Sequence, residues 1–207
     1  FGTLLASDDK ESDNIHILST QNITPALNIQ LIYDRWGGGG MLINEEVKNK
    51  TVSTSLNYLG KRYTAHAGFI SNSVTAGENG GILDISEIRD TTLESREVKV
   101  AMDKALSTTK KLTFYGDQQY RFPIEFLPWG DSLTTGFVGH SFEYSRYGRT
   151  FANGAESDSL GQTKLDNKLY FRLQPWKEKA FISKIDLGIG DYVNSYHNVT
   201  ATDTSTF

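Results

Sequence analysis

The stretch from Ile15 to Trp36 most constrains the fold of this chain, because apolar residues recur in it at every second position. In its second half, Leu27, Ile29 and Leu31 alternate with polar residues. Successive side chains of a β-strand point to opposite faces, so this period predicts a strand with one apolar face. Pro25 has no N–H to donate to a ladder and belongs in a turn. The stretch therefore predicts a long antiparallel hairpin.

The same alternation recurs along the rest of the chain. Residues 51–74 predict a second hairpin with a tight turn at Gly60–Arg62. Further strands are expected at 1–7, 110–122, 134–150, 168–174 and 184–190. We expect residues 1–207 to form part of a single all-β domain, with about eight to nine antiparallel strands in up-and-down order and no second domain.

Composition excludes several classes of protein. The chain has 207 residues, a net charge of −4 and no cysteine, so disulfide and thiolate chemistry are excluded. The sequence contains no Lys/Arg cluster with interleaved aromatic residues, which argues against a nucleic-acid partner. No run approaches the ~18–20 apolar residues that a membrane helix requires. Strands with apolar residues at alternate positions remain compatible with a membrane barrel.

The connections between the expected strands differ in length. Tighter connections are expected at 22–26, 60–62, 123–132 and 175–180, and longer ones at 8–14, 37–50, 75–109 and 151–166. The two kinds alternate, so an up-and-down sheet places the short turns on one rim, as in bacterial outer-membrane barrels. Gly37–Gly40 suits no regular element and indicates a loop, a hinge or a close backbone approach. The charged stretch 85–106 suits a short helix.

Two kinds of fold are compatible with strands that carry a stripe of apolar residues on one face only. A β-sandwich buries the stripe between two sheets, whereas a barrel turns it toward lipid. The expected strands have roughly 8–13 residues, which exceeds the ~5–6 of soluble sheets and matches the ~9–11 that span a bilayer. A sheet in lipid must pair its whole backbone and therefore close. We expect an up-and-down antiparallel transmembrane β-barrel, or a segment of one.

The two faces of the expected strands differ in charge. The residues predicted to contact lipid are Leu27, Ile29, Leu31, Leu169, Phe171, Leu173, Ile185, Leu187 and Ile189. The residues predicted to face the lumen are Asp117, Arg121, Lys168, Arg172, Lys184 and Asp186. Aromatic girdles are expected near the strand ends, at Tyr33, Trp36, Tyr63, Trp129 and Trp176. Charge should be poorly tolerated at Phe171 and Leu187, whereas Lys184→Glu should leave folding intact.

Several short runs occur in a characteristic order: STQNITPALNIQLIYDR, NGGILD, YGDQQYRF and GHSFEY. In this order they resemble the β-barrel porins of Bacteroidota over most of residues 1–195. The resemblance implies a location in the outer membrane of a Gram-negative bacterium and a passive or structural role. Barrels of that family are longer than this chain, and Phe1–Thr3 reads like the middle of a sequence, so we expect a part of a longer barrel.

Catalytic and metal-binding patterns are not found in the sequence. The four histidines, His16, His66, His140 and His197, lack metal-ligand spacing, and no cofactor motif occurs. His66 and His140 are expected to face water or a girdle. His140 cannot readily activate Ser141, because adjacent strand residues point to opposite faces. The protein is accordingly not expected to be an enzyme.

Three functional hypotheses follow. The first is an outer-membrane porin that passes small polar solutes with weak ion selectivity. The second is a structural or accessory barrel subunit in a larger assembly for secretion, surface lipoproteins or barrel insertion, because the long segment 75–109 suits partner contacts with other outer-membrane proteins or lipoproteins. The third is a secreted all-β binding module. In the two membrane hypotheses, the bilayer is a partner, the short turns face the periplasm and the longer loops face outside.

Overall fold

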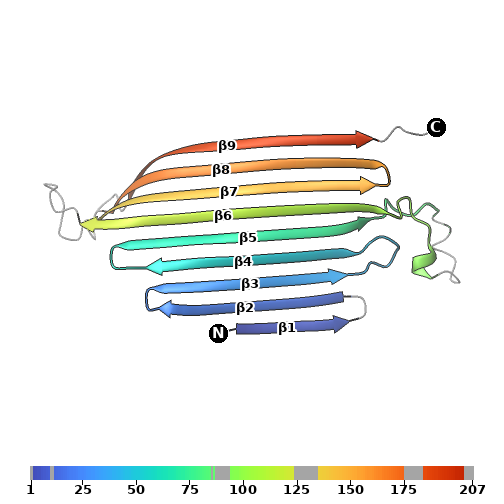
Figure 1. The fold of residues 1–207 in the computed structure, drawn as a ribbon, viewed down its shortest axis with the longest axis horizontal. Coiled ribbons are helices and arrows are strands. Elements are labelled where there is room, and N and C mark those ends of the chain that lie inside the picture. Colours follow the sequence, from blue (N-terminus) through green and yellow to red (C-terminus); the bar gives the residue numbers. More distant parts are fainter. Residues whose placement is uncertain are drawn as a thin grey trace.

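The chain folds into one nine-stranded antiparallel sheet (Figure 1). The computed structural model describes residues 2–9, 12–84, 86, 94–123, 135–174 and 184–202. The strands are β1 (Gly2–Asp9), β2 (Ser12–Thr24), β3 (Leu27–Gly38), β4 (Val47–Leu59), β5 (Tyr63–Glu78), β6 (Ala105–Pro123), β7 (Thr135–Asn153), β8 (Glu156–Gln174) and β9 (Ile185–Thr202). These elements confirm the all-β, up-and-down prediction.

Every strand pairs with its neighbours in the sequence, and the sheet order is β1 to β9 without a crossover. The predicted hairpin turn around Pro25 is confirmed, with a register irregularity between Asn22 and Thr24 on the β2 side. The turn between Leu59 and Tyr63 is confirmed as well. In the described part of the chain, β1 and β9 are the two edges of the sheet, and each pairs on one side.

Two expected long connections are strand instead. Strand β7 continues to Asn153 and β8 begins at Glu156, so the loop predicted at 151–166 is wrong. The loop predicted at 8–14 is also wrong, because Asp9 already pairs with Ser12. In both regions the apolar–polar alternation is lost, but the backbone ladder continues, since pairing needs no particular side chain. Gly154 makes the tight β7–β8 turn possible by adopting a positive φ of 61°.

The glycine run was predicted to suit no regular element, and this is wrong for its first two residues. Gly37 and Gly38 end β3 and pair with Lys48 and Val47. A Cβ on Gly37 would lie 3.0 Å from the carbonyl oxygen of Val47, so Gly37 is a place of close backbone approach, as anticipated for this run. The polar loop expected up to residue 50 therefore ends earlier, at the start of β4.

Residues 79–104 form the longest connection whose ends the structure describes, and they include a 3₁₀ helix at Ser95–Glu97. A bridge between Ile82 and Val100 closes the segment on itself. The side-chain amide of Asn44 donates to the carbonyl oxygens of Glu78, Met102 and Ala105, which ties residues 39–46 to both ends of this loop. Among the described residues, no helix is long and apolar enough to span a membrane.

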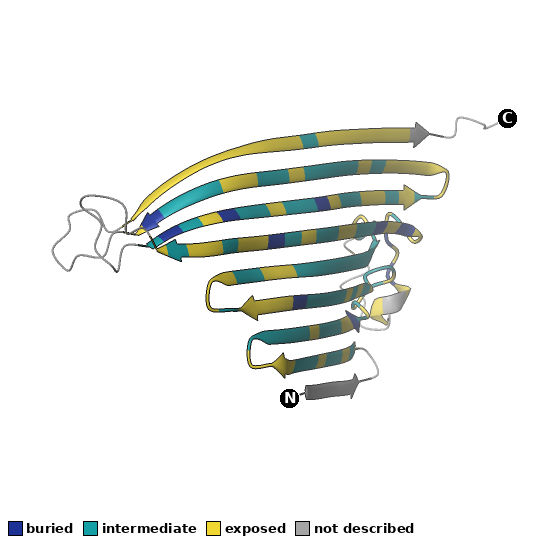
Figure 2. Cartoon of the chain, turned by 60° about the vertical axis from the view of Figure 1, so that its left-hand side comes forward, coloured by how far each residue is buried: buried dark blue, intermediate teal, exposed yellow. Residues whose placement is uncertain are grey.

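The described sheet has almost no conventional core. The buried apolar residues are Val98, Val100, Ala105 and Leu173. The accessible surface is 14767 Å², whereas a globular monomer of this size exposes about 9,700 Å². Figure 2 shows exposed and half-buried residues along the length of the strands. Pairing of neighbouring strands, and not a layer packed against the sheet, therefore holds this part of the chain together.

Candidate functional site: the two faces of the sheet

The strand register sorts the side chains onto two chemically different faces. One cross-strand row runs through Leu31, Thr54, Phe69, Phe114, Tyr144, Leu165 and Val193. We call the face that carries this row the apolar face, and the opposite one the polar face. The nine residues predicted to contact lipid all lie on the apolar face. The sequence alternation thus identified one continuous surface across strands that are distant in sequence.

Apolar residues cover only part of the apolar face. They extend from the turns at 25–26 and 60–62 to about the middle of the sheet, and we call this region the apolar band. In β8 the band runs from Leu165 to Leu173, a length that agrees with the ~9–11 residues of a bilayer-spanning strand. It is interrupted by Asn167, which contacts His140 on β7 and Asp191 on β9. Beyond it, the same face carries Thr163, Gly161 and Ser159. On β8, the apolar face therefore changes from apolar to small and polar residues between Leu165 and Thr163.

The side chains of the apolar band are uncovered. Leu169 and Leu187 are 55% and 65% exposed, and Phe114 on a central strand is 41% exposed. Soluble monomers rarely expose contiguous apolar patches beyond a few hundred Å². Apolar side chains on this face of the described sheet therefore have no protein layer over them.

Tyrosines mark the limit of the apolar band near the turns. Tyr63 lies opposite Tyr120, and its ring centroid is 5.9 Å from that of Tyr58. The Tyr63 hydroxyl donates to Oε1 of Gln118 at 2.6 Å. Tyr33 lies on the same face at the other limit of the band. These rings combine an apolar body with a polar tip, as residues at a membrane interface do.

Trp36 does not follow the predicted girdle pattern. Trp36 pairs with Asn49 on the polar face, so its assignment to a girdle beside Tyr33 is wrong. The sequence places Trp36 three residues after Tyr33, and an odd spacing in a strand reverses the face. The predicted girdle residues Trp129 and Trp176 lie outside the described residues.

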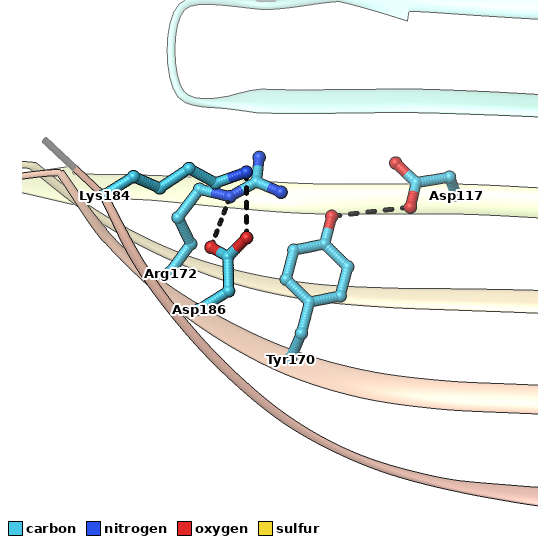
Figure 3. A network of polar contacts seen from close by, with 5 residues as sticks. All are labelled: Asp117, Tyr170, Arg172, Lys184 and Asp186. Carbon is cyan, nitrogen blue, oxygen red and sulfur yellow. Dashed lines mark hydrogen bonds and ion pairs between the residues drawn. The ribbon is translucent and has the colours of Figure 1, made fainter.

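The six residues predicted to face the lumen are placed as follows. Asp117, Arg121, Lys168, Arg172 and Asp186 all lie on the polar face. Lys184 immediately precedes β9, and its Nζ is 2.8 Å from Oδ2 of Asp186. The Arg172 Nε donates to Oδ1 of the same carboxylate at 2.8 Å (Figure 3). The carboxylate of Asp186 thus pairs with both the Lys184 ammonium and the Arg172 guanidinium.

Tyr170 connects this ion pair to a second acid. Its hydroxyl lies 3.4 Å from Oδ2 of Asp117, two strands away on β6 (Figure 3). The ring crosses β7 at Gly139, where any Cβ would overlap the Tyr170 side chain. The guanidinium of Arg172 lies 5.5 Å from the ring centroid, which adds a cation–π contact. We call Asp117, Tyr170, Arg172, Lys184 and Asp186 the polar cluster.

A similar arrangement occurs on neighbouring strands. Tyr115 lies across Gly68, and its ring meets His66 edge to face at a centroid distance of 5.3 Å. An aromatic ring that covers a glycine on the next strand fills the place of the missing side chain and fixes the register. On the polar face, tyrosines therefore lie along the surface of the sheet.

The remaining two predicted residues are separate from the polar cluster. The Arg121 side chain donates to the carbonyl oxygen of Lys61 in the β4–β5 turn at 3.3 Å. Lys168 makes no hydrogen bond or ion pair with the described residues, and its stem passes over Gly188. Glu143 and Lys164, which the sequence reasoning missed, form an ion pair at 3.5 Å on the same face. The even spacing of Lys164 from Lys168 on β8 was the available signal, whereas β7 carries none of the predicted residues and offered no such signal for Glu143.

The histidines do not form a catalytic or metal site in the described part of the chain. His66 lies on the polar face, as expected. His140 pairs with Leu169 on the apolar face, where Nε2 is 2.7 Å from Oδ1 of Asn167. Ser141 lies on the opposite face, which confirms that His140 cannot activate it. Among the described residues, no group of three or more metal-binding side chains occurs.

Comparison with known proteins identifies a family. The chain matches a family model described as "Putative porin" over residues 3–204. The search of curated proteins and the search of solved structures found no match.

Proposed function

Because this chain belongs to the putative porin family, we propose that it forms part of an outer-membrane β-barrel that passes small polar solutes. One observation carries the proposal: two opposite faces of the same strands have opposite chemistry. Family membership implies association with a membrane bilayer, and porins are typically not enzymes. The apolar band contacts lipid, and the polar face lines a water-filled lumen.

The exposure of the apolar band supports the lipid assignment. Leu187 and Ile189 are 65% and 78% exposed although they lie opposite Phe171 and Leu169 on the next strand. In water such a surface would drive aggregation, whereas lipid tails solvate it without cost. Tyrosines at both limits of the band then occupy the two interfaces of the bilayer.

The composition of the polar face supports a hydrated lumen with weak selectivity. Asp117, Glu143 and Asp186 face the same space as Arg121, Lys168 and Arg172. The described side chains of both signs balance approximately, so neither cations nor anions are strongly excluded. A solute that passes this surface meets charges and amides, which favours polar solutes.

The position of the band supports a sidedness. It adjoins the turns at 25–26 and 60–62, whereas the opposite ends of the strands continue beyond it with polar residues on both faces. Outer-membrane barrels have short periplasmic turns, and their strands and longer loops extend on the outer side. We therefore assign the turns at 25–26 and 60–62 to the periplasm, and the loops at 39–46 and 79–104 to the outside.

The edges of the sheet also need partners in this setting. In the described part, β1 and β9 each have one unpaired side, and lipid does not tolerate unsatisfied backbone groups. In the membrane these edges pair with each other or with further strands of the full protein. Either pairing gives a closed barrel.

Reconstitution of the full-length protein in planar lipid bilayers tests the pore. We expect discrete conductance steps with a reversal potential close to zero in a salt gradient. A protein that extracts only with detergent but gives no steps contradicts the pore and retains the barrel. Recovery within a larger complex after mild extraction would favour the accessory-subunit alternative, which the loop at 79–104 motivates. Solubility of the full-length protein without detergent would exclude both the porin and the accessory-subunit hypotheses.

A further inference from the structure

We propose that the apolar face carries a binding site for the phosphate of a lipid headgroup, formed by Lys50, Lys110 and Arg146 at the outer limit of the apolar band. The site rests on the proposed membrane orientation. It goes beyond pore function, because it lies on the face opposite the lumen.

The three cations come from three strands but meet at one place. Lys50 and Lys110 flank Ser73 in one cross-strand row, so their backbones are about 10 Å apart at the usual strand spacing. Arg146 pairs with Leu112 in the next row, which places it diagonally to Lys110 at about 7–8 Å. All three side chains are exposed. Long, flexible cationic side chains at these spacings reach a common anion.

A groove of about 650 Å³ lies between these residues. Ser71 and Ser73 contribute small side chains to its lining, Gly148 contributes only backbone, and Leu112 contributes an apolar side chain. The groove is therefore polar on the side of the cations and continuous with the apolar band on the other. This combination suits a molecule with a charged head and a hydrocarbon tail, and not a free anion.

The charges in the groove are not neutralised by the described part of the protein. Nearby cations on the same face have carboxylate partners: Arg35 pairs with Asp13 at 3.0 Å and Lys48 with Glu46 at 3.1 Å. Lys50, Lys110 and Arg146 make no ion pair with any described residue. Lys50 lies 5.9 Å from the ring centroid of Tyr33, which holds it at the limit of the band. Three unpaired cations on one small surface repel one another unless an anion binds.

The height of the groove along the strands indicates a lipid as its ligand. Val52 and Leu112, the last apolar residues of the band on β4 and β6, belong to the groove lining. A lipid whose tails lie against the band has its headgroup at this height. Cations beside a membrane surface contribute about 1 kcal/mol each toward anionic lipids, so removal of all three should weaken binding on the order of 100-fold.

The test compares lipid binding to the full-length protein in neutral detergent by native mass spectrometry. The first variant is Lys50→Gln/Lys110→Gln/Arg146→Gln. The matched control, Arg149→Gln/Lys164→Gln/Lys168→Gln, removes the same charge from the polar face. Phosphatidic acid is the probe, phosphatidylcholine the neutral lipid and inorganic phosphate the competitor. Heat-modifiable gel mobility verifies that each variant folds.

We expect the wild type and the control to prefer phosphatidic acid over phosphatidylcholine and the first variant to lose that preference. A first variant that folds and retains the wild-type preference for phosphatidic acid would overturn the site. Displacement of phosphatidic acid by millimolar inorganic phosphate would also overturn it, in favour of a free-anion site. Absence of conductance with the lipid preference intact would contradict only the pore.

Discussion

The hydroxyl of Tyr170 on β8 reaches the carboxylate of Asp117 on β6 across the whole width of β7, at 3.4 Å. The contact is possible because Gly139 leaves room for the ring between the two strands. It couples Asp117 on β6 to the ion pair between Arg172 on β8 and Asp186 on β9. The polar cluster is therefore a property of the sheet and not of a single hairpin.

Gly139→Ala should destabilise the sheet, because the new Cβ overlaps the Tyr170 ring. Overpacking of this kind costs about 1–3 kcal/mol, which we expect as a lower urea midpoint of unfolding. Gly161→Ala is the matched control, since its Cβ would meet no atom closer than 3.7 Å. Equal midpoints for the two variants would show that Tyr170 moves away without cost.

Leu169→Arg and Lys168→Glu test the two faces at adjacent positions of β8. Arginine at the bilayer midplane costs about 2–4 kcal/mol, so Leu169→Arg should reduce the fraction of protein that shows heat-modifiable mobility. Lys168 makes no ion pair with the described residues, and Lys168→Glu should fold like the wild type. If both variants fold equally well, no lipid lies against Leu169.

Lys168→Glu should also shift the selectivity of the pore toward cations, because it adds negative charge on the polar face. The reversal potential in a potassium chloride gradient measures the shift. Lys48→Glu is the control, since Lys48 lies on the opposite face beside Glu46. An equal shift in both variants would show that the polar face does not line the conducting path.

Asn44→Gly should release the loop at 79–104. Asn44 has a positive φ of 59°, which glycine adopts without strain, so the variant removes only the amide that donates to Glu78, Met102 and Ala105. We expect faster hydrogen exchange and proteolysis within 79–104, with unchanged exchange in β7 and β8. Unchanged protection of the loop would mean that its own bridge between Ile82 and Val100 is sufficient.

Much of the sheet was predictable from the sequence where one face is apolar. The alternation at Leu27, Ile29 and Leu31 and the turn at Pro25 were read correctly, because apolar side chains mark every second position there. The same rule failed at 151–166. Ser157, Ser159 and Thr163 lie on the apolar face beyond the band, so both faces are polar and the strand has no periodic signal.

The polar cluster was only partly predictable. Strand periodicity placed Arg172 and Asp186 on one face, but it does not give the register between strands. That Tyr170 lies opposite Gly139, and so can reach Asp117, depends on this register. The groove between Lys50, Lys110 and Arg146 was not predictable for the same reason: these residues are far apart in sequence and become neighbours only through β5 and β6.

The neighbour-to-neighbour order of the strands also determines how fast such a chain can assemble. Each described strand pairs with the one that precedes it, so every pairing step closes only the short segment between two successive strands. The entropy lost on closing a segment grows with its length, which makes the β7–β8 hairpin an early step and the connection through 79–104 a later one. In the proposed barrel, closure through the outer edges of β1 and β9, directly or through further strands, brings together the most distant residues. Zipping should therefore proceed hairpin by hairpin, with ring closure as the slow final event.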